Sequence, residues 1–77
     1  MNHTPIKDDD INFLLNISRE VTEELINKYA NVYLLLLNLP NGTLVITGNA
    51  GMFFKELKEN PQAKIEEMKK NHIVFKN

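Results

Sequence analysis

The spacing of apolar residues in the first third of the chain predicts one long amphipathic helix. From Ile11 onward, apolar side chains recur at positions 11, 14, 15, 17, 21, 25, 26 and 29, the spacing of one helix face. Three aspartates at positions 8–10 precede this stripe, where carboxylates cap a helix and complement its dipole. We therefore expect a helix over residues 9–29. Ser18 could instead cap a second segment, but a single helix is the preferred interpretation.

Two apolar runs on either side of Asn41-Gly42 predict a β-hairpin. Asn-Gly favours a two-residue type I′ turn, because both central positions of that turn need positive φ. We assign the strands to residues 32–39 and 43–47. A turn with Asn41 and Gly42 at its centre pairs Leu39 with Leu44 and Leu37 with Ile46.

Strand alternation divides this hairpin into two faces that are both rich in apolar residues. The face expected to join the core holds Tyr33, Leu35, Leu37, Leu39, Leu44 and Ile46. The second face carries Leu34, Leu36 and Val45. An antiparallel sheet with one solvated face should alternate between apolar and polar residues, so we expect both faces to be covered. The cover is either the chain's own helices, divided between the two faces, or another protein.

The C-terminal third predicts two helices and a short strand. Apolar residues at 52, 53, 54 and 57 indicate a helix capped by Asn49, and Pro61 suits the first turn of a second helix. The segment 72–76, HIVFK, favours a third strand. The expected fold is a small α+β sandwich with the order α-β-β-α-α-β. We expect residues 1–77 to form a single domain that begins with a loose arm at 1–7.

Composition argues against several functional classes. The 77 residues include no cysteine, so disulfides and thiolate metal sites are excluded. His3 and His72 lie near opposite ends of the chain, and we expect neither a metal nor a cofactor. A net charge of −1 and a single arginine, Arg19, argue against a nucleic-acid partner. Ser18, the only serine, lies far in sequence from either histidine, so we expect no enzymatic activity.

The sequence also predicts a location and a setting for the protein. The N-terminus, MNHTPIKDDD, is polar and acidic where a signal peptide would be basic and then apolar. The longest apolar run, VYLLLL, is too short to cross a bilayer. We therefore expect a cytoplasmic protein with no membrane partner. Eleven asparagines and eight lysines against one arginine suggest an AT-rich genome and are compatible with a phage or mobile-element accessory protein.

The loop from Gly48 to Gly51 is the one segment that resembles a ligand site. A glycine loop between a strand and a helix can present N–H groups to an anion, and Lys55 follows one turn later. However, neither the dinucleotide-binding pattern nor the P-loop pattern is present. The structural interpretation is that glycine supplies the turn while Asn49 caps the helix. Gly48, Asn49, Gly51 and Lys55 remain the candidate residues for binding a small ligand or a nucleotide.

The segment LLNLPNGTLVITGNAG at residues 36–51 resembles the opening hairpin of PAS sensor domains. In those domains too, a strand, a glycine turn, a second strand and an asparagine precede a helix. The rest of this chain is too short for their five-stranded sheet. The resemblance therefore implies neither a complete fold nor a function.

The second face of the hairpin gives the leading hypothesis about function. Exposed apolar patches usually mark partner surfaces, and a small domain without disulfides gains stability from association. We expect a non-enzymatic protein-binding module, an adaptor or an inhibitor, that is homodimeric. Its partner-binding residues are Leu34, Leu36 and Val45.

Overall fold

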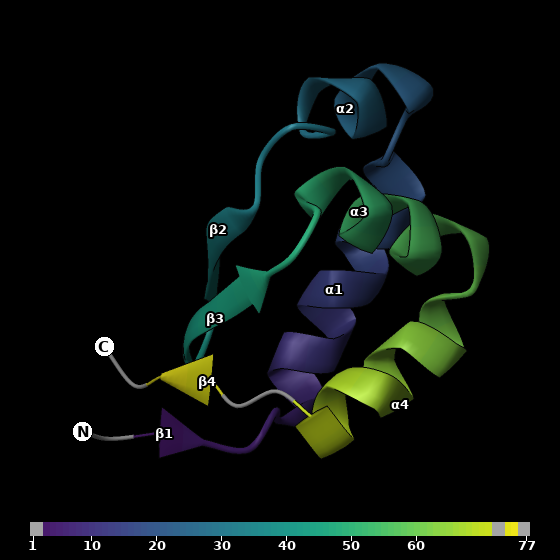
Figure 1. The fold of residues 1–77 in the computed structure, drawn as a ribbon. Coiled ribbons are helices and arrows are strands. Elements are labelled where there is room, and N and C mark those ends of the chain that lie inside the picture. The colour runs from purple at the N-terminus through teal and green to yellow at the C-terminus, as the bar shows by residue number, and fades with distance from the viewer. Residues whose placement is uncertain (1–2, 72–73, 76–77) are drawn as a thin grey trace.

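The computed structural model describes residues 3–71 and 74–75 and has a mixed α+β fold. Two helices precede the hairpin and two follow it (Figure 1). The strands form one sheet in the order β1-β4-β3-β2. The elements are β1 (His3–Thr4), α1 (Asp8–Glu20), α2 (Glu23–Lys28), β2 (Leu34–Leu39), β3 (Gly42–Thr47), α3 (Ala50–Glu59), α4 (Pro61–Asn71) and β4 (Val74–Phe75).

The expected helix over residues 9–29 is wrong in one respect, because the chain breaks between α1 and α2. Val21 is extended, with φ −68° and ψ 130°, and its side chain is buried. Thr22 then caps α2, and its Oγ1 accepts a hydrogen bond from the Leu25 N–H at 3.1 Å. A threonine cap competes with helix continuation because it satisfies an amide at a new helix start. The break lies beyond the Ser18 position considered from the sequence.

The hairpin turn differs from the expected one, and the strand register is shifted by two residues. Leu39 pairs with Gly42 and Leu37 with Leu44, so Pro40 and Asn41 form the turn. Proline fixes φ near −65°, which is incompatible with a type I′ turn at its first central position. Among the described residues, only glycines have positive φ, so Asn41 does not adopt the expected conformation.

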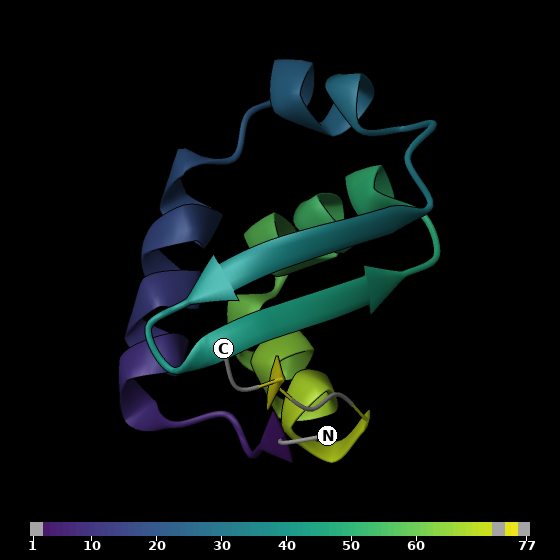
Figure 2. The same ribbon diagram turned by 90° about the vertical axis from the view of Figure 1, so that its left-hand side faces the viewer.

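Within β2 and β3 the division of the hairpin into two faces is nevertheless confirmed, because a shift of two residues leaves the side chains of both strands on their original faces. On the inner face, Leu39, Leu44 and Ile46 are buried and contact the core. Figure 2 looks onto the opposite face of the hairpin, with α1, α3 and α4 behind the strands. The helical layer therefore lies on one side of the hairpin. The completely buried apolar residues of the core are Leu14, Leu44, Ala50, Leu57 and Met68.

The third strand expected at 72–76 lies partly outside the described residues, which leave out 72, 73 and 76. Within it, Val74–Phe75 forms β4, which pairs antiparallel with β3 through Leu44 and Thr43. In the segment expected to be a loose arm, His3–Thr4 forms β1 and pairs with β4.

Asp10 connects α1 to the tip of the hairpin. It is completely buried although it carries a carboxylate. Its Oδ2 accepts a hydrogen bond from the Lys7 N–H at 3.0 Å. Its Oδ1 accepts hydrogen bonds from the backbone N–H of Asn41 at 3.1 Å and from the Asn41 side-chain amide at 3.2 Å. Three donors thus stabilise the carboxylate, which fixes the turn against the first helix.

Candidate functional site

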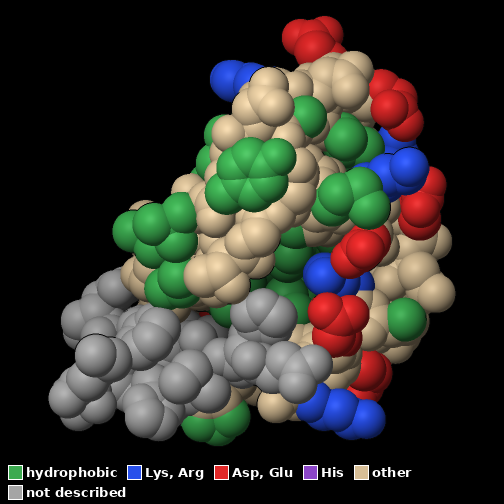
Figure 3. Space-filling view, in the orientation of Figure 1, with side chains coloured by type: hydrophobic (Ala, Val, Ile, Leu, Met, Phe, Trp, Pro, Cys, Tyr) green, Lys and Arg blue, Asp and Glu red, His purple; other side chains and the backbone are tan. Residues whose placement is uncertain are grey.

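The three predicted partner-binding residues, Leu34, Leu36 and Val45, lie together on the face of the hairpin turned away from the helices. We call these three residues the outer face. Leu36 pairs across the strands with Val45, and Leu34 pairs with Thr47. Leu34 and Leu36 are each 62 % exposed, while Val45 is half-buried. Figure 3 shows hydrophobic side chains gathered over the hairpin side of the molecule.

Tyr33 is exposed, although alternation along the strand predicts a core position for it. Its side chain is 62 % exposed, so that prediction is wrong. The residue lies just before β2, which begins at Leu34, so the burial pattern of the strand does not reach it. The preference of tyrosine for surfaces that are partly apolar and partly polar is the sequence signal that could have placed it here.

The outer edge of β2 presents unpaired backbone groups. The Gly48 N–H donates to the Tyr33 carbonyl at 3.2 Å, which makes Tyr33 and Gly48 a hydrogen-bonded pair. Hydrogen-bonded pairs alternate along an antiparallel ladder, so Leu35, Leu37 and Leu39 direct their backbone groups toward β3. The backbone N–H and C=O groups of Leu34, Leu36 and Asn38 point the opposite way. In the part of the sheet that the structure describes, β2 is an end strand, so these groups face an open edge.

The hairpin and the segments around it contain no charged residue. Lys28 and Lys55 bracket a stretch of the sequence without aspartate, glutamate, lysine or arginine. Exposed edge strands in monomeric proteins commonly carry lysine, proline or a bulge that discourages pairing with another chain. Here Pro40 lies in the turn, and the β2–β3 pairing continues without interruption from Leu34 to Leu39. The apolar surface therefore lacks the usual protection.

Three amides of the glycine loop, those of Gly48, Ala50 and Gly51, have intramolecular acceptors. The Gly48 N–H donates to the Tyr33 carbonyl, and the Ala50 N–H donates to the Val32 carbonyl at 2.8 Å. The Met52 N–H donates to the Asn49 side chain at 3.0 Å, which confirms Asn49 as the cap of α3. A helix N-terminus binds an anion through free N–H groups. The hydrogen bonds of this loop favour its structural interpretation.

Gly51 is needed for the close approach of α3 to α2. Its N–H donates to the Tyr29 carbonyl at 3.0 Å. A Cβ atom at this position would lie 2.6 Å from the Ile26 carbonyl oxygen. Lys55, the fourth residue of the candidate ligand site, is exposed on α3. The second glycine thus serves helix packing, while Gly48 adopts a φ of 96° that other residues rarely adopt.

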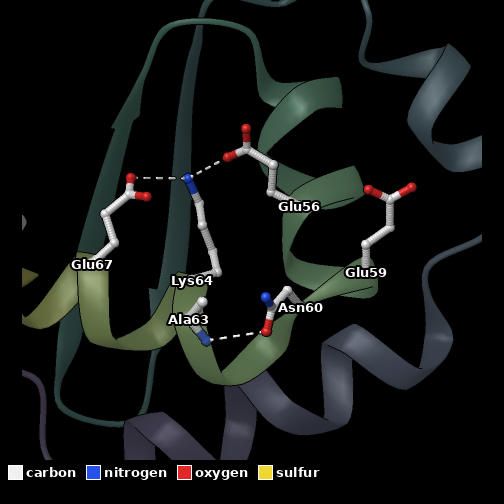
Figure 4. Close-up of a pocket in the computed structure, with 6 residues that line it drawn as sticks. All are labelled: Glu56, Glu59, Asn60, Ala63, Lys64 and Glu67. Atoms are coloured by element: carbon white, nitrogen blue, oxygen red, sulfur yellow. Dashed lines mark hydrogen bonds and ion pairs between the residues drawn. The ribbon is translucent and has the colours of Figure 1, made fainter.

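A pocket of about 240 Å³ lies between α3 and α4 and is lined by Glu56, Glu59, Asn60, Ala63, Lys64 and Glu67 (Figure 4). Lys64 Nζ lies 2.8 Å from Glu56 and 3.3 Å from Glu67, and its side chain is 10 % exposed. Burial lowers the pKa of Lys64, but the hydrogen bonds and charges of the two glutamates outweigh burial and raise the pKa above 10.5. Lys64 also lies over the Phe53 ring, 5.4 Å from its centroid. These contacts hold the two helices together.

Neither a metal site nor a membrane span is found among the described residues. No group of three or more histidine, cysteine, aspartate or glutamate residues could hold a metal within the ranges 3–71 and 74–75. No helix in this part of the chain is both long enough and apolar enough to cross a membrane. No family model matches the chain, and neither the curated proteins nor the solved structures contain a significant match.

Proposed function

We propose that this protein is a non-enzymatic protein-binding module, homodimeric, whose outer face forms the contact surface. The observation that carries the proposal is the exposure of Leu34 and Leu36, each 62 % exposed on a hairpin without charge. Contiguous apolar surface of this kind on a small protein is typical of an interface.

The energetics indicate what a partner must cover. Burial of a whole leucine side chain contributes about 1.5–3 kcal/mol. Because 62 % of each side chain is exposed, covering the exposed part contributes about 1–2 kcal/mol per leucine. A homodimer buries the leucines of both copies, four side chains that give about 4–8 kcal/mol, whereas association costs about 4–15 kcal/mol or more in lost freedom of motion. The leucines alone therefore offset only the lower part of this cost. A stable partner must also contact Tyr33 or the open edge of β2.

The small size of the chain supports association. At 77 residues without cysteine, the protein has a limited core and no disulfide to stabilise it. Binding of a partner to the folded state alone raises stability by mass action. In a homodimer that partner is a second copy of the same chain, which is present wherever the protein is.

Light scattering on wild type and Leu36→Lys tests the proposal. We expect the wild type to be a dimer and Leu36→Lys to be a folded monomer, because the substitution buries a charge in the interface. Gln62→Lys is the matched control, since it adds the same charge at an exposed position on α4. Circular dichroism verifies that all three proteins are folded. A wild type that is monomeric at every concentration, or equal dimerisation of both variants, would contradict the proposal.

A further inference from the structure

We propose that two copies of the chain join by antiparallel pairing of β2 with the β2 of the second copy, which forms one continuous sheet. This inference rests on the proposed function and specifies how the homodimer is built. It adds the open edge of β2 to the contact made by the outer face, and it names a second copy of this chain as the occupant.

The direction of the backbone groups makes this edge suitable for pairing. The N–H and C=O groups of Leu34, Leu36 and Asn38 point away from β3, as the register and the Tyr33–Gly48 hydrogen bond establish. A second strand laid along the edge satisfies these groups with a regular antiparallel ladder. The pairing leaves the bonds between β2 and β3 in place.

Symmetry selects one register. In a two-fold dimer both copies use the same residues, so the strand must pair with itself about a central point. Only residues whose backbone groups point outward form hydrogen-bonded pairs. Centring the axis on Leu36 places Leu36 opposite its own copy and Leu34 opposite Asn38 of the second copy. Among registers that obey this alternation, this one forms the most hydrogen-bonded pairs within Leu34–Leu39, three against two for an axis centred on Leu37.

Charge favours a second copy over a charged partner. The uncharged stretch between Lys28 and Lys55 includes the whole hairpin, so two copies of β2 meet without like-charge repulsion. On the face that Figure 3 shows, charged side chains of both signs gather away from the hairpin, over the helical side of the molecule. A second β2 strand therefore matches this edge in both hydrogen bonding and polarity.

Burial along β2 points to the same contact. Leu35 and Leu37 belong to the inner face and pack against the core, yet both remain only half-buried. An end strand is covered from one side only, so its inner side chains stay partly open to water. Pairing with a second copy places a neighbouring strand beside both the inner and the outer side chains of β2. It also places the outer-face side chains of the two copies side by side, Leu36 against its own copy, so that they cover part of one another.

Asn38→Pro tests the edge without altering the apolar side chains. Because the Asn38 N–H points outward, proline at this position removes no bond to β3. It removes one donor from each copy, which should weaken dimerisation about tenfold or more. Asn38→Ala is the matched control, since it also loses the Thr43 hydroxyl bond to Asn38 but keeps the N–H. We expect Asn38→Ala to remain a dimer under conditions in which Asn38→Pro, still folded by circular dichroism, dissociates.

Cross-linking tests the register. The chain has no cysteine, so a single introduced thiol is unique. Leu36→Cys should form a disulfide-linked dimer under mild oxidation, because opposite residues of a hydrogen-bonded pair have Cα atoms about 5.5 Å apart. Leu34→Cys should not, since its own copy lies four residues away along the strand. Linkage of Leu34→Cys but not of Leu36→Cys would overturn the register.

The two proposals fail in different ways. If Asn38→Pro dimerises as well as Asn38→Ala while Leu36→Lys is monomeric, the outer face is the interface and edge pairing is wrong. If Leu36→Lys, Asn38→Pro and Asn38→Ala all match the wild type in mass, both proposals are wrong. Weaker dimerisation of Asn38→Pro alone, together with cross-linking of Leu36→Cys, supports the continuous sheet.

Discussion

Asp10 offers the sharpest test of how the hairpin is attached to the helices. Its carboxylate is completely buried and accepts hydrogen bonds from Lys7 and from two N–H groups of Asn41. Asp10→Asn keeps the shape of the side chain but replaces one acceptor oxygen with an NH₂ donor. In either orientation of the amide, at least one buried N–H then faces another donor.

The expected cost follows from these contacts. A buried donor without an acceptor costs about 1–3 kcal/mol. Loss of a negative charge in the first turn of α1 adds up to about 1 kcal/mol. We therefore expect Asp10→Asn to lower the free energy of unfolding by about 1–4 kcal/mol. For a domain of 77 residues, whose total stability is about 4–12 kcal/mol, this is a large fraction.

Urea denaturation followed by far-ultraviolet circular dichroism measures this change. Asp9→Asn is the control, because Asp9 is exposed in the same turn and its substitution removes the same charge. Its expected cost is below about 1 kcal/mol. If Asp10→Asn and Asp9→Asn have the same unfolding free energy within experimental error, the buried connection to the turn is not a stabilising contact.

Three further predictions concern the loop and the helix pair. Gly51→Ala should cost about 1–3 kcal/mol or more in denaturant unfolding, because its Cβ would lie 2.6 Å from the Ile26 carbonyl oxygen. Gly48→Ala meets no atom within 4 Å but must adopt a φ of 96°, so we expect about 1–2 kcal/mol; a neutral effect would contradict the backbone assignment. The pKa of Lys64 is raised above 10.5 in the folded state, so its contribution is present below that pH and is lost as the pH rises through the folded value. The free energy of unfolding should therefore fall more between about pH 9 and about pH 11.5 for wild type than for Lys64→Met. An equal fall in both proteins would count against the ion pair between Lys64 and Glu56.

Local sequence signals predicted the parts of the fold that depend on neighbouring residues. The asparagine cap of α3 and the start of α4 at Pro61 are confirmed. Both follow from short-range rules. The asparagine side chain accepts a hydrogen bond from an amide in the first turn of α3, and proline suits the first turn of α4 because an N–H there has no partner within the helix. The two faces of the hairpin are confirmed for the same reason, since alternation is a property of the strand itself.

Features that depend on tertiary contacts could not be predicted in this way. The Asn41-Gly42 signal favoured a type I′ turn, but Pro40 occupies the first central position, and Asp10 holds Asn41 from a distant helix. The break after α1 places Val21 in the core, which apolar spacing alone could not distinguish from a continuous helix. The open edge of β2 likewise became visible only once the strand order was known.

Amide hydrogen exchange at Leu36 tests most directly whether β2 is an interface. We predict that the Leu36 N–H, which points to the open edge, exchanges rapidly in dilute protein and becomes protected as the concentration rises. The Leu37 N–H, which points toward β3, should be protected at both concentrations and serves as an internal reference. At a protein concentration of about 1 mM, only very weak dimers stay dissociated. If the Leu36 N–H still exchanges rapidly at that concentration, the claim that this strand is an interface is contradicted.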